Sequence, residues 1–428
     1  MMEEALALGQ TELGRFDLLP RLTFNAGYVE KSDSLATTSR DAVTGQSSDA
    51  HPTYSSDRWS KTLDLGLSWN ILDFGVSYFT AHQNADRVLV AVERRRKAVH
   101  TLTAEVRSVF WRVAAYQTLK EDITRTMAEA NAALAQARRA EMENLKAPIE
   151  VLRYQKALLE TMRQLTAIKQ DLSTSVTELA VLINVSPGAE IPLEMPNELV
   201  LPNWDVPLEQ MEEEAFLNNP DVREQGYLAR IAVNDTRKEI VKRLPGITFT
   251  VERKSDYNSF LMDNHWYEAG TRLSWSLLNL FSAPAAIAYA KAGEELTKAR
   301  RLALRMAVLA QIHIATRQFH GLADQFRQAD ALWTVDHRLA EIADARAAND
   351  AQSLLERVAT HASTLASRLR RFQVYAQAEQ AFAKIQAALG RDLLPDTMPD
   401  EAPEIDSLST AIAARLQSWR DGTDVSVP

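Results

Sequence analysis

The sequence predicts a mostly α-helical protein with a small β part, in which one strand-plus-helix unit is written twice. Leu-Ser-Trp occurs at 67–69 and again at 273–275, each time at the end of an alternating segment that leads into a long stretch fit for helix. The 428 residues include only 14 Gly and 15 Pro, so turns are scarce and long helices are favoured. We therefore expect an internally duplicated strand hairpin joined to a long coiled-coil hairpin.

The first repeat is expected to cover residues 1–186. Its start has early acidic residues and no sustained apolar run, so no signal peptide is visible in this chain. Leu19-Pro20 matches Leu244-Pro245, but the counterpart of the block 207–225 would fall before residue 1. We therefore expect the chain to be N-terminally incomplete, with an export signal lost with the missing piece.

Two strands are predicted in each repeat, at about 21–30 and 61–72 and at about 246–254 and 265–277. Their residues alternate between apolar and polar, the period of a β-strand with two different faces. The polar positions include the candidate pore-lining residues Asp64, Glu252, Glu268 and Arg272. Polar filling of a barrel interior explains the same four residues equally well.

These strands are about as long as a tilted strand that crosses a bilayer, with aromatic residues near several ends. A half-buried hairpin of a soluble protein shows the same alternation. Four strands alone leave two open edges, and closed membrane barrels start at about eight strands. A closed barrel therefore requires several copies of the chain. Two copies would give eight strands and three would give twelve, and the sequence is compatible with both.

Helical hairpins are expected at about 76–186 and 285–394. The return segment of the first carries apolar residues at a strict step of seven, which is typical of coiled-coil packing: Val151, Leu158, Leu165, Leu172 and Leu179. A Pro-rich connector at 187–207 separates the repeats, the second of which covers 208–394. An acidic tail follows at 395–428.

Composition and missing motifs exclude several functions. Cysteine is absent, which removes disulfides and thiol chemistry, and the net charge of −9 argues against nucleic acid as a partner. No run of 18 apolar residues is present, so a transmembrane helix is not expected. Phosphate-binding loops, nucleophile elbows and metal-binding His motifs are also missing. We predict a protein that is not an enzyme and needs no cofactor or metal.

The order strand, loop, strand, long helical hairpin and Pro-rich connector, followed by the same again, resembles the TolC-type outer-membrane efflux and secretion channel family. Leu-Pro opens each strand pair, and Leu72-Asp73-Phe74-Gly75 is echoed by Leu278-Asn279-Leu280-Phe281. The resemblance implies a homotrimer, with a twelve-stranded β-barrel in the Gram-negative outer membrane joined to an α-helical barrel in the periplasm. It also implies two partners, a periplasmic adaptor (membrane fusion protein) and an inner-membrane pump or ABC transporter.

The same resemblance places a periplasmic mouth at the hairpin tips. Asn144 stands where the family has Gly, and Glu150 where it has a carboxylate; Asp350 and Glu356 repeat this at an offset of 206 residues. The implied gate candidates are Glu150, Glu356, Arg153 and Gln352. The implied adaptor-contact candidates are Asn144, Leu145, Lys146, Asp350 and Ala351. The chain departs from the family pattern at Ala347, Gln352 and Ala359, where Tyr, Arg and an acidic residue are expected.

The function expected from these features is a passive export duct of a tripartite efflux pump or a type I secretion system. A soluble coiled-coil scaffold or periplasmic adaptor protein is the alternative, in which the short hairpins only cap the helical rods. The sequence does not identify the exported substrate.

Overall fold

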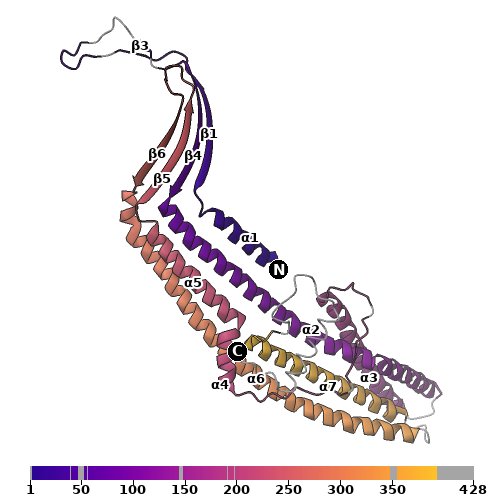
Figure 1. The fold of residues 1–428 in the computed structure, drawn as a ribbon. Helices are drawn as coiled ribbons and strands as arrows, with labels where there is room; N and C mark the ends of the chain where they lie inside the picture. Colours follow the sequence, from indigo (N-terminus) through magenta and orange to yellow (C-terminus); the bar gives the residue numbers. More distant parts are fainter. Residues whose placement is uncertain are drawn as a thin grey trace. The chain divides into compact units, whose positions relative to one another are not determined.

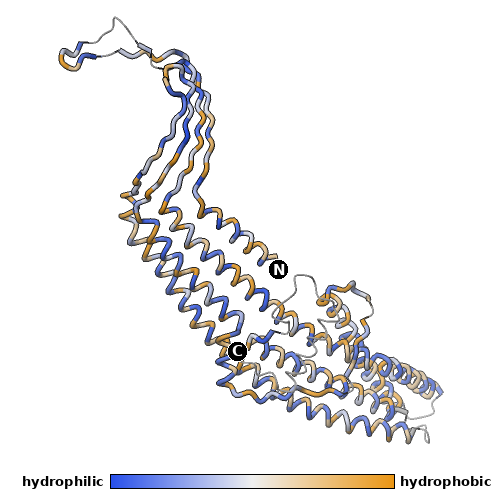
Figure 2. The backbone as a smooth tube through the Cα atoms, in the orientation of Figure 1, coloured by the Kyte–Doolittle hydropathy of each residue, from blue (hydrophilic) through white to orange (hydrophobic). Residues whose placement is uncertain are grey.

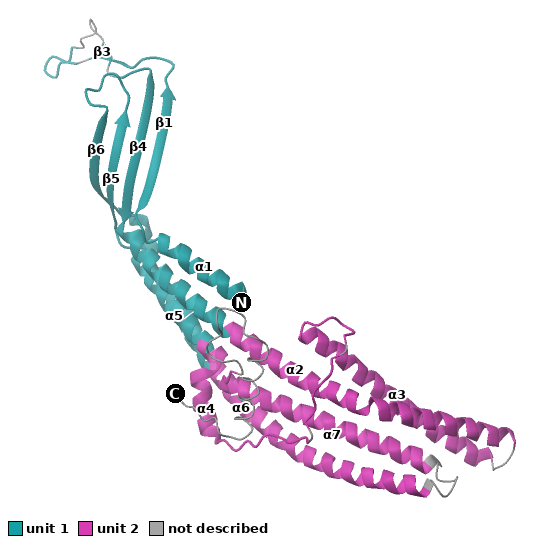
Figure 3. Cartoon of the chain, turned by 45° about the vertical axis from the view of Figure 1, so that its right-hand side comes forward, with its two compact units in different colours: residues 1–93, 224–302 teal, residues 94–223, 303–428 magenta. Residues whose placement is uncertain are grey.

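The computed structural model describes residues 2–38, 40–46, 53–54, 56–143, 148–189, 191–196, 198–347 and 354–392. The chain forms two compact units (Figure 3). Unit 1 comprises residues 1–93 and 224–302, and unit 2 comprises residues 94–223 and 303–428. Each unit contains parts of both sequence repeats, so the boundary between the repeats is not the boundary between the units.

Unit 1 holds a four-stranded antiparallel sheet with the strand order β1-β4-β5-β6 (Figure 1). The strands are β1 (Arg21–Glu30), β4 (Trp59–Asn70), β5 (Gly246–Asp256) and β6 (His265–Ser274). The short strands β2 (Ala36–Thr37) and β3 (Thr53–Tyr54) pair with each other in the loop between β1 and β4. The β4–β5 pairing joins the two sequence repeats side by side.

Two strand predictions run too far at their C-terminal ends. β4 ends at Asn70 rather than 72, and β6 ends at Ser274 rather than 277. After β4, the Asn70 side-chain Oδ1 accepts hydrogen bonds from the backbone N–H of Leu72 (2.8 Å) and of Asp73 (3.4 Å). This is a helix N-cap, and it explains why helix begins where the apolar alternation still continues.

Both long helices therefore begin earlier than expected. α2 covers Ile71–Met142, whereas the sequence predicted a start near 76, and α6 covers Leu277–Ala347, whereas the prediction was 285. Pro284 lies inside α6. Pro284 is the eighth residue of α6 and has no backbone N–H, so one hydrogen bond of the helix is lost there. The helix nevertheless continues beyond it.

The two faces of the sheet differ in chemistry, and the alternation can be followed in Figure 2. We define the apolar face by the side chains of Leu22, Phe24, Tyr28, Trp59, Leu63, Leu65, Leu67, Trp69, Phe249, Val251 and Leu273, which are all exposed in the single chain. The opposite, polar face bears Thr, Asn, Ser and charged residues. A row of exposed large apolar side chains indicates that this face meets a partner or a membrane.

The helices of unit 1 keep the order of the strands. α1 (Met2–Phe16) leads into β1, and α5 (Pro220–Val241) leads into β5. The side chain of Asn84 on α2 donates to the Gln10 carbonyl of α1 (3.4 Å), and Thr236 on α5 donates to Glu294 on α6 (3.5 Å). With α2 also bound to α5, the lateral order α1, α2, α5, α6 continues the strand order.

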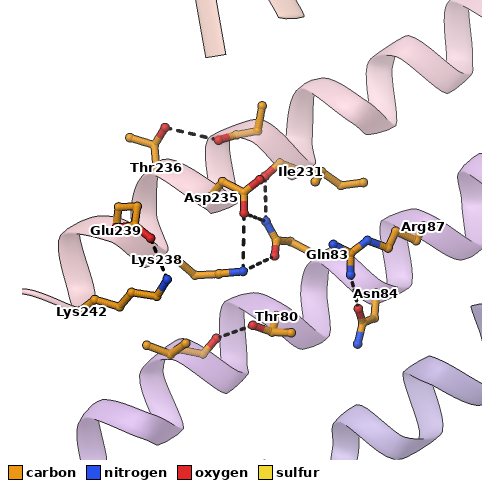
Figure 4. Close-up of polar contacts among 12 residues, drawn as sticks. Thr80, Gln83, Asn84, Arg87, Ile231, Asp235, Thr236, Lys238, Glu239 and Lys242 are labelled. Carbon is orange, nitrogen blue, oxygen red and sulfur yellow. Dashed lines mark hydrogen bonds and ion pairs between the residues drawn. The ribbon is translucent and has the colours of Figure 1, made fainter. Parts of the chain in front are cut away.

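The α2–α5 contact is built around Gln83, which is completely buried (Figure 4). Its Nε2 donates to the Ile231 carbonyl (2.9 Å) and to Asp235 Oδ1 (2.7 Å), while its Oε1 accepts from Lys238 Nζ (2.8 Å). Because each polar atom of the buried amide has a partner, the network avoids a desolvation cost and fixes one alignment of the two helices.

Unit 2 consists of helices packed around several apolar clusters. It contains α3 (Pro148–Leu182), α4 (Leu208–Asn218), α7 (Leu354–Leu389) and the later parts of α2 and α6. The heptad residues of α3, Val151 to Leu179, are all buried, which confirms the predicted seam. Leu119 and Ile123 of α2 pack there against α3 and against Phe372 of α7.

The end of α7 is fastened to the junction of α4 and α5. Gly390 has φ +74°, and a Cβ at this position would lie 2.1 Å from the Asn218 carbonyl oxygen, so only glycine fits. Asn219 Nδ2 donates to the Ala388 carbonyl (2.8 Å). Beside it, Asp392 binds Arg96 Nε (2.8 Å) and His100 Nε2 (2.6 Å) of α2.

Replacing Asp392 by Asn is expected to destabilise the protein by about 1–3 kcal/mol at neutral pH, because Arg96 and His100 lose a charged partner. Burial alone raises the pKa of a carboxyl, but at Asp392 the His100 hydrogen bond and the Arg96 charge outweigh it and lower the pKa. This stabilisation is therefore complete above the ordinary value of 3.8 and is lost as the pH falls through the native pKa below it.

The measurement is the urea midpoint of both proteins across pH, followed by circular dichroism. The difference between wild type and Asp392→Asn should be large at pH 7 and vanish in acid. Glu213→Gln, which removes an exposed carboxylate from the middle of α4, serves as the control and should leave the midpoint unchanged. A difference that persists below the native pKa would show that the charge is not responsible.

Candidate functional site: the polar sheet face and the hairpin ends

The strand register places all four predicted pore-lining residues on the polar face of the sheet. Asp64 of β4 lies opposite Lys254 of β5, and Glu252 of β5 lies opposite Glu268 of β6. Arg272 lies opposite Thr248, four positions from Glu268 along β6 and nearer the helices. The three carboxylates are thus gathered in neighbouring strands, whereas Arg272 stands apart from them.

Lys254 joins this group, although it was not among the pore-lining residues predicted from the sequence. Its Nζ lies 2.8 Å from Glu268 Oε2 and 3.2 Å from Glu252 Oε2. The position was readable from the alternation, because Lys254 follows Glu252 by two residues and so shares its face. One lysine against Asp64, Glu252 and Glu268 leaves the group with a net negative charge.

Aromatic residues mark both ends of the apolar face. Trp59 begins β4 near the loops and Trp69 lies near its helix end. Ten residues at a rise of about 3.4 Å span roughly 34 Å. A strand tilted by about 35–45° converts that length into a height of roughly 24–28 Å, which matches the apolar band of about 25 Å in outer-membrane barrels. The face therefore has the dimensions of a lipid-facing surface.

At the hairpin ends, Glu150 and Glu356 occupy equivalent positions. Each is the third residue of its helix, α3 or α7, and each side chain is exposed. The first turn of a helix favours a carboxylate because unpaired N–H groups give it a partial positive charge. Glu356 also lies 3.9 Å from Arg346 of α6, which sequence reasoning did not identify. Arg153 of α3 is exposed as well.

The remaining tip residues lie outside the described part of the chain. This holds for the gate candidate Gln352. It also holds for the adaptor-contact candidates Asn144, Leu145, Lys146, Asp350 and Ala351.

Polar contacts behind the tips connect the helices of unit 2. Arg357 of α7 pairs with Glu129 of α2 (3.3 Å), and His361 of α7 pairs with Asp344 of α6 (2.8 Å). Val358 packs next to Arg357 against α2 and α3 and is completely buried. The start of α7 is therefore held by three other helices, which fixes the direction in which Glu356 leaves the bundle.

Among the residues that the structure describes, no helix has the length and apolar character needed to cross a membrane. The same residues contain no cluster of three or more His, Asp or Glu suited to a metal ion.

Comparisons with known proteins agree with this geometry. Residues 2–185 match the family model described as outer membrane efflux protein. No curated protein sequence matches the chain.

Several solved structures share the fold at low sequence identity. The CmeC outer membrane channel of Campylobacter jejuni has a TM-score of 0.69 and 11% identity, over 99% of this chain and 86% of that one. The MtrE outer membrane channel of Neisseria gonorrhoeae, in its open state, gives 0.68 and 15%, over 91% and 84%. The outer membrane protein VceC of Vibrio cholerae gives 0.65 and 13%, over 91% of each chain.

Residues 2–185 thus match a family of outer-membrane efflux proteins, and the chain has the fold of solved outer-membrane channels. The resemblance drawn from the strand and helix order is thereby confirmed.

Removing the lysine charge with Lys254→Gln is expected to make the channel at least about twofold more selective for cations, because Glu252 and Glu268 lose their neutralising partner. The measurement is the reversal potential in planar bilayers under a KCl gradient.

The matched control is Arg253→Gln, which removes the same charge one residue away. Arg253 lies on the apolar face of the same strand, so this variant should keep the wild-type reversal potential. Equal shifts in both variants would argue against a pore on the polar face.

Proposed function

We propose that the chain forms a passive export duct that crosses the outer membrane and extends into the periplasm. The observation that carries this is the four-stranded sheet, with one apolar face of bilayer height and one charged face. Helices α1, α2, α5 and α6 continue its strand order. A barrel closed from such sheets has lipid outside, a polar lumen inside and a helical tube as its extension.

Closure requires further copies of the chain. β1 and β6 are the edges of the sheet, and within the described part of the chain no strand pairs with their outer sides. Neighbouring strands alternate in direction, so β6 of one copy can pair antiparallel with β1 of the next. Exposed apolar side chains on α1 (Leu6, Leu13) and α6 (Leu296, Leu302) give the helices a comparable edge.

Three copies fit a duct better than two. An eight-stranded barrel has an interior that side chains fill, whereas wider barrels leave an aqueous channel. The polar face carries Glu252, Lys254, Glu268 and Arg272, which need room if solutes are to pass. We therefore infer a homotrimer with one twelve-stranded barrel joined to a helical barrel.

The periplasmic end is the proposed gate and docking region. Glu150 and Glu356 from three protomers would place six carboxylates around one axis, with Arg153 and Gln352 beside them. Asn144, Leu145, Lys146, Asp350 and Ala351 would contact a periplasmic adaptor, which couples the duct to an inner-membrane pump or an ABC transporter. A tripartite efflux pump agrees with the family match, and type I secretion would use the same duct.

Extraction and electrophysiology test the proposal against a coiled-coil scaffold or adaptor. We expect the protein in the outer-membrane fraction as a heat-modifiable trimer that conducts in planar bilayers. Recovery as a soluble monomer or dimer without conductance would favour the scaffold.

The gate assignment predicts that Glu150→Gln combined with Glu356→Gln weakens block by a trivalent cation added on the periplasmic side by about tenfold or more. A ring of carboxylates attracts a multivalent cation far more strongly than single surface acids do. The measurement is the concentration of cation that halves the single-channel current.

Glu160→Gln is the matched control, since Glu160 is another exposed acid of α3, ten residues or about 15 Å further along the helix. It should leave the block unchanged. If the double variant behaves like Glu160→Gln, the two acids only stabilise their helix starts.

A further inference from the structure

A groove of about 590 Å³ lies at the loop end of the sheet in unit 1. The residues that line it come from β1, from β4 and from the position after β5: Ala26, Gly27, Tyr28, Trp59, Lys61, Thr62, Leu63 and Tyr257. Five of these belong to the alternating apolar-face positions of β1 and β4. The groove therefore opens on the apolar face, the side opposite Lys254 and its carboxylates.

Lys61 gives this apolar groove a positive charge. Its Nζ lies 5.2 Å from the centre of the Trp59 ring, which stabilises the ammonium through the ring's electron density. No ion pair with Lys61 is present among the described residues, and its side chain is exposed. The nearest acid on this face is Glu30, next to Trp59 in the sheet, and its Oε2 accepts from the Tyr28 hydroxyl at 3.4 Å.

The position of the groove along the strands indicates how a lipid would lie in it. Trp59 and Lys61 stand at the loop end of the apolar face, and Leu63, Leu65 and Leu67 follow toward the helices. A lipid at this place would have its acyl chains beside the leucines and its headgroup beside Lys61. Aromatic rings with a polar edge, such as Tyr28 and Tyr257, suit the level between the two.

We propose that the groove binds the phosphate of an anionic membrane lipid, with Lys61 as the cation, with Trp59 and Tyr257 beside the headgroup and with Leu63 against the upper acyl region. A free phosphate ion would gain nothing from the three aromatic rings and the leucine row. A lipid uses both the charge and the apolar surface, and one lysine at a membrane surface attracts anionic lipid by about 1 kcal/mol. The inference rests on the proposed position of the sheet in the membrane.

Native mass spectrometry of the assembled full chain tests it, with phosphatidylglycerol and phosphatidylcholine added in equal amounts. The wild type should retain phosphatidylglycerol in preference to phosphatidylcholine. Lys61→Gln should lower phosphatidylglycerol retention about fivefold, which corresponds to the loss of about 1 kcal/mol. Lys61→Arg keeps the charge and should retain the lipid, which guards against an effect of misfolding.

Arg253→Gln is the matched control. Arg253 lies opposite Leu65 on the same apolar face, four positions along β4 from Lys61 and outside the groove. If it lowers retention as much as Lys61→Gln does, the attraction is a general charge effect and the groove is not a site. Equal retention of both lipids, or release of the lipid by excess inorganic phosphate, would also overturn the proposal.

The outcome separates this inference from the proposed function. A conducting trimer that shows no preference for phosphatidylglycerol contradicts the lipid site alone. A protein that does not enter the membrane fraction contradicts both.

Discussion

The register between β4 and β5 is the constraint on which the rest of the structure depends. It pairs residues 62–70 with residues 248–256, so it joins the two repeats at separations of 178 to 194 residues. Because side chains alternate along a strand, a slip of one residue would turn Asp64 and the other polar residues of β4 to the apolar face. The same pairing sets α2 beside α5, since α2 follows β4 and α5 precedes β5.

The alignment of the helices is fixed by a few buried polar contacts and not by apolar packing alone. Leucine seams tolerate sliding, because one apolar residue can replace another in a similar hole. The amide of Gln83 does not, since its three hydrogen bonds are satisfied only when Ile231, Asp235 and Lys238 face it. In unit 2 the close approach of Gly390 to Asn218 has the same effect at the end of α7.

Much of this fold could be predicted from residue patterns. Period-two alternation located the four long strands, and the step of seven from Val151 to Leu179 located the buried seam of α3. The strand ends could not be located in this way, because Ile71 and Leu277 continue the alternation although they belong to helices. Only the hydrogen bonds of Asn70 reveal where β4 stops.

The site was predictable to a lesser degree. Asp64, Glu252, Glu268 and Arg272 were found because they occupy the polar positions of the alternation, yet their spacing within the face depends on register, which a single sequence does not contain. Lys254 was overlooked although it shares that face, because its bonds to Glu252 and Glu268 cross strands. Likewise, the Arg346 partner of Glu356 comes from the opposite helix of the hairpin.

Arg253 and Lys254 are neighbours in β5, and because side chains alternate along a strand their charges lie on opposite faces of the sheet. Lys254 points to the polar face and is bound by two carboxylates, so it reduces the negative charge there. Arg253 points to the apolar face, where Tyr267 lies beside it and the adjacent strand presents Leu65. A long cationic side chain in such surroundings reaches along apolar surface toward water. The net charge of the chain, −9, hides this division. Negative charge gathers where solutes would pass, and positive charge is placed where lipid would lie.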